Sequence, residues 1–200
     1  MLKLLARVVL ILMGVALGLL CLFLAVLGVA RIHSWSETGR MAPPNYPGLE
    51  RFDVISFAAD PLRAAMEIGG NTLLVVIGLC GLAATIMTLW RGLGWIQNWP
   101  AFLPLTISMV FWGAVAATFV GRIDWILPES ALLGALAIGI DWVRLRHQGL
   151  PITARVSQVV VSPNRADSER SHKGVGMRIA VAAMIFLLAI LKLITGAGQH

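Results

Sequence analysis

Residues 8–30 read VVLILMGVALGLLCLFLAVLGVA and contain no charged side chain. An α-helix rises about 1.5 Å per residue, so about 20 such residues cross the hydrocarbon core of a bilayer. The apolar core of a secretory signal is only about 7–15 residues long, which favours an uncleaved anchor. This run therefore predicts a transmembrane helix over residues 4–30, which begins beside Lys3 and Arg7.

The composition of the whole chain agrees with this interpretation. Of 200 residues, 58% are hydrophobic and 13% are charged. A soluble domain has about 25% charged residues, so this chain has too few to cover a soluble surface. The polar residues stand in blocks between long apolar runs, which is typical of membrane proteins. The sequence predicts an all-α integral membrane protein with a single polytopic domain.

Four further segments extend the first to a bundle of about five transmembrane helices. The second and third, residues 71–89 and 101–120, carry no charge, and tryptophans lie near their ends as expected at headgroup level. The fourth, residues 125–143, is the weakest because it has a carboxylate near each end. A re-entrant segment beside four spans is the alternative for it. The fifth is residues 177–194.

The distribution of lysine and arginine predicts the orientation. Cytoplasmic segments of membrane proteins carry the excess of basic residues. Five spans with a cytoplasmic N-terminus and an extracytoplasmic C-terminus place most of the basic residues inside, including those between Arg144 and Arg178. A fourth segment that failed to cross would put that basic run outside. The short basic N-terminus and this bias together favour a bacterial inner membrane, that is, the cell membrane.

The polar stretch over residues 31–70 is expected to be an extracytoplasmic loop. Asp60 is followed by proline, which predicts an N-cap acceptor and the start of a short helix over residues 61–68. Gly69 and Gly70 are expected to bend the chain between that helix and the second span.

Residues 144–176 are expected to form a basic cytoplasmic loop. Its β-branched part, residues 152–161, predicts one strand, which would need a partner or a lipid surface. Arg144, Arg146 and Arg178 are the candidate contacts to anionic lipid, because basic residues near the cytoplasmic surface are attracted to it. Basic and aromatic residues are not interleaved, so nucleic-acid binding is not expected.

Ionisable residues inside a membrane are the first place to look for function. Glu129 is the candidate contact for a proton or a cation, with Asp124 and Arg122 close by in the sequence. The alternative is a carboxylate that faces water at the positive end of a helix. Asp141 and Arg144 are three apart, which predicts a plain surface pair.

Two pairs of small residues are spaced four apart, as in helices that pack closely. They are Gly14 with Gly18 in the first segment and Ala135 with Gly139 in the fourth. The spacing favours packing either within the chain or against another protein.

The sequence lacks the motifs of common catalytic and cofactor sites. No histidine lies inside a predicted span, and no H-E-x-x-H, nucleophile elbow or Walker-type loop is present. Cys21 and Cys80 both lie in apolar runs and are expected to be buried small hydrophobes. We therefore expect no metal ion, haem or other cofactor, and an enzyme is less expected than a binding protein.

Three functions remain as hypotheses. The first is a non-enzymatic accessory, assembly or regulatory subunit of an envelope complex, whose partners are the bilayer and other membrane proteins or copies of itself. The second is a small transporter or channel component that depends on Glu129. The third is a membrane enzyme acting on lipid substrates, which would need one of four side chains: Asp124, Glu129, Asp141 or His147.

Overall fold

The computed structural model describes residues 2–42 and 46–160, and all its regular secondary structure there is helical. The long helices are α1 (Leu2–Thr38), α2 (Pro61–Arg91), α3 (Leu103–Phe119) and α4 (Ile126–His147), and a short α5 (Val156–Val160) follows. Three 3₁₀ turns, η1 (Leu49–Arg51), η2 (Leu93–Asn98) and η3 (Ile123–Trp125), lie in the connections. The predicted all-α class is confirmed for these residues.

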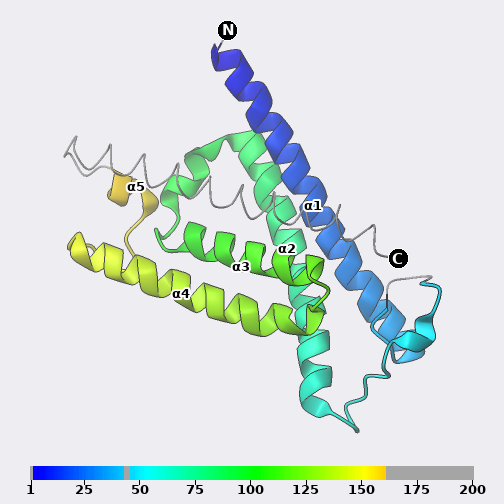
Figure 1. The fold of residues 1–200 in the computed structure, drawn as a ribbon. Coiled ribbons are helices and arrows are strands. Elements are labelled where there is room, and N and C mark those ends of the chain that lie inside the picture. The colour runs from blue at the N-terminus through cyan, green and yellow to red at the C-terminus, as the bar shows by residue number, and fades with distance from the viewer. Residues whose placement is uncertain (1, 43–45, 161–200) are drawn as a thin grey trace.

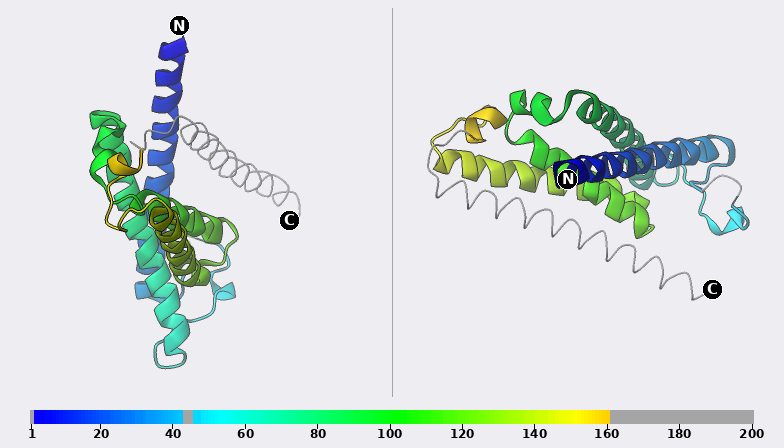
Figure 2. Two further views of the ribbon diagram at one scale, coloured as in Figure 1. Left: turned by 90° about the vertical axis from the view of Figure 1, so that its left-hand side faces the viewer. Right: turned by 90° about the horizontal axis from the view of Figure 1, so that it is seen from above.

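The helices form two antiparallel pairs (Figure 1). Helix α1 packs along α2, and α3 packs along α4, while the second pair runs across α2 at a steep incline. The first turns of α1 extend past the other helices, as the left view of Figure 2 shows. A shared core joins the pairs, with Leu24 from α1, Leu74 from α2, Phe111 from α3 and Ile126 from α4.

Within the described residues, three helices are long and apolar enough to cross a membrane: Ile11–Thr38, Pro61–Arg91 and Ile123–His147, of 28, 31 and 25 residues. Helix α3 has only 17 residues, fewer than the roughly 20 that a full crossing takes. The fourth segment, which the sequence made the weakest candidate, is thus long and apolar enough to cross, whereas the helix of the third segment is shorter than expected. The predicted fifth span lies outside the described residues.

Helix α3 starts later in the sequence than predicted, because residues 154–156 form hydrogen bonds with the residues just before it. The Ala101 N–H donates to the Ala154 carbonyl at 2.8 Å, and the Val156 N–H donates to the Trp99 carbonyl at 2.9 Å. These bonds tie residues 99 and 101 to the segment around Arg155, and α3 begins after them, at Leu103. Gly121, with φ +75°, ends the helical path just after α3 because that left-handed conformation suits glycine.

Helix α4 continues beyond its uncharged apolar stretch, residues 131–140, because Asp141 does not end the helix. The Asp141 side chain is buried, at 3% residue exposure, and its Oδ1 lies 3.8 Å from Arg144 Nη1. The expected surface pair is therefore wrong in one respect, since its carboxylate lies inside the fold. The helix continues to His147, and Gly149, with φ +68°, follows its end.

Helix α2 begins as predicted but does not bend as predicted. Asp60 Oδ1 accepts from the Arg63 N–H at 3.0 Å, and proline occupies the first turn. The helix then runs unbroken through Gly69 and Gly70. The glycines serve packing instead: a Cβ on Gly70 would lie 2.9 Å from the Ile123 carbonyl oxygen, so only glycine allows η3 to come this close.

The strand predicted over residues 152–161 is wrong. Its described part contains a turn and helix α5, with only an isolated bridge between Pro100 and Arg155. The Gln158 side-chain oxygen accepts from the Arg155 N–H at 2.8 Å, which caps the start of the helix. This local cap and the lack of a partner strand outweigh the β preference of the valines.

The connection between α1 and α2 is fastened to the helix ends. Trp35 Nε1 donates to the Ile55 carbonyl at 3.0 Å, and the Ile55 N–H donates to the Gly39 carbonyl at 2.8 Å. Ile55 and Met41 are buried there against Ala64. This connection therefore packs on the bundle.

Candidate functional site

Charged side chains from three separate segments lie within electrostatic range of Glu67. Glu67, in the second turn of α2, lies within electrostatic range of Arg31 from α1 and Asp124 from η3, as well as Arg63 from its own helix. Gly70 brings η3 against α2 at this level. We call the group Arg31, Glu67, Asn71 and Asp124 the polar junction.

Asn71 is the most deeply buried member of the polar junction. The residue is 0% exposed, and its Nδ2 donates to the Glu67 carbonyl at 2.8 Å and contacts Met41 Sδ at 3.7 Å. Its Oδ1 and the Nε of Arg31 are buried and make no hydrogen bond to the residues described. A buried amide without its full set of partners costs free energy, so this position constrains the fold.

An open surface pocket of about 170 Å³ lies beside η3, between the end of α3 and the start of α4, and its Arg122 and Trp125 side chains are exposed. Its polar lining is Glu129 and Arg122, and its apolar lining comes from Trp125 and from three small residues of α3 and its end, Ala116, Ala117 and Val120. Arg122 Cζ lies 4.6 Å from the Trp125 ring centroid, in a cation–π contact. We call this space the η3 cavity.

The two charges of the η3 cavity are not paired with each other. The ion pairs found within the described segments join His33 to Glu37, Arg63 to Asp53 and Arg144 to Asp141. None includes Arg122 or Glu129. Glu129 lies in the first turn of α4, where the helix dipole favours a carboxylate. Both charges thus face the same space and are free to contact a molecule within it.

The four side chains expected for a lipid enzyme divide into two groups. Asp124 and Glu129 lie at the start of α4, and Asp141 and His147 lie in its last turns. Twelve residues separate Glu129 from Asp141, which corresponds to about 18 Å along the helix. The two groups are therefore too far apart to act on one bond.

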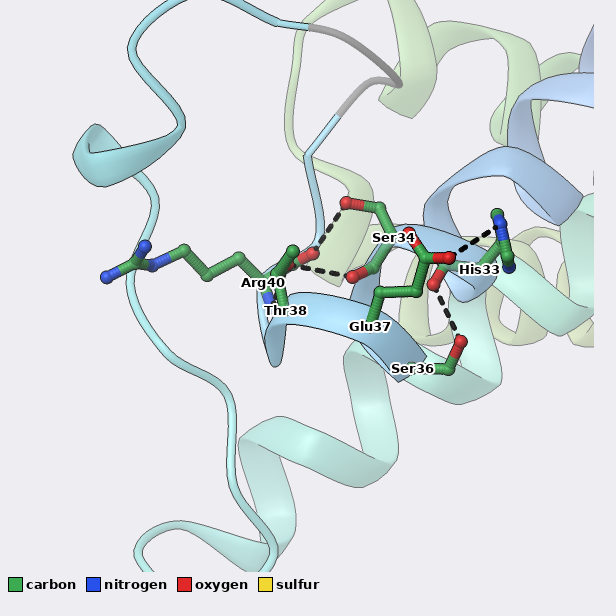
Figure 3. Close-up of polar contacts among 6 residues, drawn as sticks. All are labelled: His33, Ser34, Ser36, Glu37, Thr38 and Arg40. Carbon is green, nitrogen blue, oxygen red and sulfur yellow. Dashed lines mark hydrogen bonds and ion pairs between the residues drawn. The ribbon is translucent and has the colours of Figure 1, made fainter.

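A second, larger groove of about 420 Å³ runs between residues 29–36 of α1 and residues 72–76 of α2. Its lining is mostly apolar, with His33, Ser36 and Thr72 among valines and an isoleucine. Figure 3 shows the polar contacts at this end of α1: His33 Nε2 lies 3.2 Å from Glu37 Oε1, and Ser36 Oγ donates to the His33 carbonyl at 2.7 Å. These are local contacts of a helix end rather than a catalytic arrangement.

The predicted packing residues lie in different environments. Gly14 and Gly18 face α2, where added Cβ atoms would lie 3.0 Å from Leu89 Cδ2 and 3.6 Å from Thr85 Cγ2. Ala135 is exposed, and a Cβ on Gly139 would meet no atom within 4 Å. The α4 pair therefore presents a small-residue surface outward.

The predicted lipid-contacting arginines lie at the far end of α4. Arg146 is exposed and stacks over Trp142, with 5.4 Å from Cζ to the ring centroid. Arg144 is half-buried beside Asp141. Arg178 lies outside the described residues.

The prediction that both cysteines are buried is correct for one of them. Cys21 is buried in the α1–α2 interface, whereas Cys80 is exposed on α2. Over residues 2–42 and 46–160, no three His, Cys, Asp or Glu side chains come together as a metal site would require.

Sequence reasoning did not find the polar junction. Arg31 and Glu67 stood in a polar loop, and Asn71 was only the first residue of a span. The one local signal was an amide at the start of an otherwise apolar run.

Comparison with known proteins adds no relative, since no family model, curated protein or solved structure matches this chain.

Proposed function

We propose that this chain is an integral membrane protein that acts as a non-enzymatic accessory, assembly or regulatory subunit of an envelope complex. The observation that carries the proposal is the exposed apolar surface of α1. Ile11, Leu12 and Met13 are 54%, 63% and 62% exposed, and consecutive helical residues point about 100° apart. Apolar side chains thus cover α1 on several sides where it extends past α2, and lipid or a partner helix must cover them.

The polar residues fit this role. They gather at the polar junction and at the end of α4, and the mostly apolar groove contains no catalytic arrangement. We further propose that the N-terminus is cytoplasmic and the bilayer is a bacterial inner membrane, because the basic residues favour that orientation.

The main test is to purify the full chain from native membranes in mild detergent and identify what is recovered with it. A stoichiometric set of membrane proteins supports the subunit role. Recovery of the protein alone or only with itself contradicts it. A photo-crosslinking amino acid at the exposed Met13 position should capture the same partner, and the buried Leu24 position, 0% exposed, is the matched control.

The second candidate is a transporter or channel component, and the η3 cavity favours it because Glu129 lines an otherwise small and partly apolar space. Glu129→Gln should then abolish flux in reconstituted vesicles while the protein stays folded. The control is Glu50→Gln, because Glu50 is exposed in η1 and lies outside the cavity. Undiminished flux in Glu129→Gln would exclude this mechanism.

A further inference from the structure

The η3 cavity brings three chemical features together. It has a cation at Arg122, an anion at Glu129, and an aromatic ring with small apolar side chains beside them. Arg122 makes its one described contact with the Trp125 ring, which leaves the guanidinium N–H groups available at their edge. A cation and an anion that face one space without pairing suit a molecule that carries both charges.

The level of the cavity in the fold suggests where that molecule comes from. Arg31 is the first charge after the apolar run of α1, Glu67 is the last before the apolar run of α2, and Arg122 is the first after α3. Glu67 lies within electrostatic range of Arg31 and of Asp124 in η3. Three separate boundaries between apolar and polar sequence thus coincide, as expected at the headgroup level of one bilayer face.

We infer that the η3 cavity binds the headgroup of a phospholipid that carries a primary amine, of the phosphatidylethanolamine type. The Arg122 guanidinium donates to the phosphate, and the Glu129 carboxylate accepts from the ammonium. Trp125 lies at the glycerol level, and Ala116, Ala117 and Val120 leave room for the first part of an acyl chain.

The size of the cavity agrees with this ligand. A water molecule takes up about 30 Å³ of liquid, so 170 Å³ corresponds to about five or six waters. An ammonium group, two methylene groups and the nearest oxygen atoms of a phosphate fit such a space.

The carboxylate gives the site its selectivity. A primary ammonium donates hydrogen bonds to Glu129, whereas the quaternary ammonium of phosphatidylcholine has no N–H to donate. Phosphatidylglycerol brings no positive charge for Glu129. The site should therefore prefer phosphatidylethanolamine, and Arg122 should contribute equally to the binding of every phospholipid because all of them carry the phosphate.

The experiment reconstitutes the full-length protein into vesicles of equal parts phosphatidylethanolamine, phosphatidylcholine and phosphatidylglycerol. The lipids that remain bound after extraction into mild detergent are then counted by native mass spectrometry. Wild type should retain phosphatidylethanolamine about tenfold over phosphatidylcholine, as one charged hydrogen bond allows. Glu129→Gln should remove the preference, Arg122→Gln should lower the retention of all three lipids, and Glu50→Gln should change nothing.

A methylation series on wild type tests the inference without any variant. Retention should persist for the mono- and dimethylated amines and fall when the third methyl removes the last N–H. Equal retention across the series, or a preference that survives in folded Glu129→Gln protein, overturns the inference. Displacement of the bound lipid by soluble glycerophosphoethanolamine would contradict the part of the inference that makes a membrane lipid the ligand.

The inference depends on the proposed membrane location but not on the subunit role. Lipid selectivity is measured on the isolated protein, whereas partner recovery is measured from native membranes. A protein that binds the lipid selectively and has no partner contradicts only the subunit proposal.

Discussion

The α1–α2 pair and the α3–α4 pair are both joined through glycines, but different atoms set the distance between the helices. In the first pair, a Cβ on Gly78 would lie 2.6 Å from the Cys21 carbonyl oxygen and 2.7 Å from the Ala25 nitrogen. In the second pair, a Cβ on Gly113 would meet the tip of Leu133 at 2.6 Å.

This difference distinguishes a rigid contact from an adaptable one. Backbone atoms move only when a whole helix moves, whereas a leucine tip moves by a change of rotamer. The α1–α2 pair should therefore be the fixed frame of the fold, and the α3–α4 pair should tolerate substitution.

The largest effect should come from Gly78→Ala. The new methyl has no space unless α1 and α2 separate, so we expect a loss of about 3 kcal/mol in the free energy of unfolding. Denaturant titration of helicity in detergent micelles measures it. A loss below that of Gly113→Ala would show that backbone contact does not fix this pair.

Gly113→Ala should have a smaller effect, a loss of about 1 kcal/mol, because Leu133 can change its rotamer. The same titration applies. The double variant with Leu133→Ala checks the reason given, because removing the leucine tip should abolish the clash, and a persistent clash would implicate the α3 backbone instead.

Gly139→Ala should have the opposite sign. The position is helical and a Cβ there meets no atom within 4 Å, so alanine should stabilise the isolated protein by about 0.5–1 kcal/mol. If the outward small-residue surface of α4 contacts a partner, the same change should weaken recovery of that partner while it raises the stability of the chain.

The smallest effect should come from Glu37→Gln. Its contact with His33 joins two side chains that are 63% and 70% exposed, and exposed pairs contribute about 0–1 kcal/mol. We expect a change below about 0.5 kcal/mol at any pH from 6 to 8. A larger loss would mean that the α1 end is covered in the native protein.

Local signals predicted the starts and the lengths of some elements but not of others. The Asp60 cap was predicted because an acceptor and a following proline act within one turn. The short α3 was not, since the Ala101–Ala154 hydrogen bond joins positions that are far apart in the sequence. The continuous α2 was missed because Gly69 and Gly70 were considered only for their flexibility, while their packing partner η3 lies some fifty residues later.

The sequence by itself determined that the chain is helical and that its helices are apolar along most of their length. Hydropathy and helix capping depend on neighbouring residues, so they can be read without a fold. Only the tertiary structure decided that Glu67 lies within electrostatic range of Arg31 and Asp124, and that Arg122 and Glu129 face one cavity. The physical reason is that glycine contacts such as Gly70 with Ile123 set the distances between segments, and such contacts leave no periodic trace in the sequence.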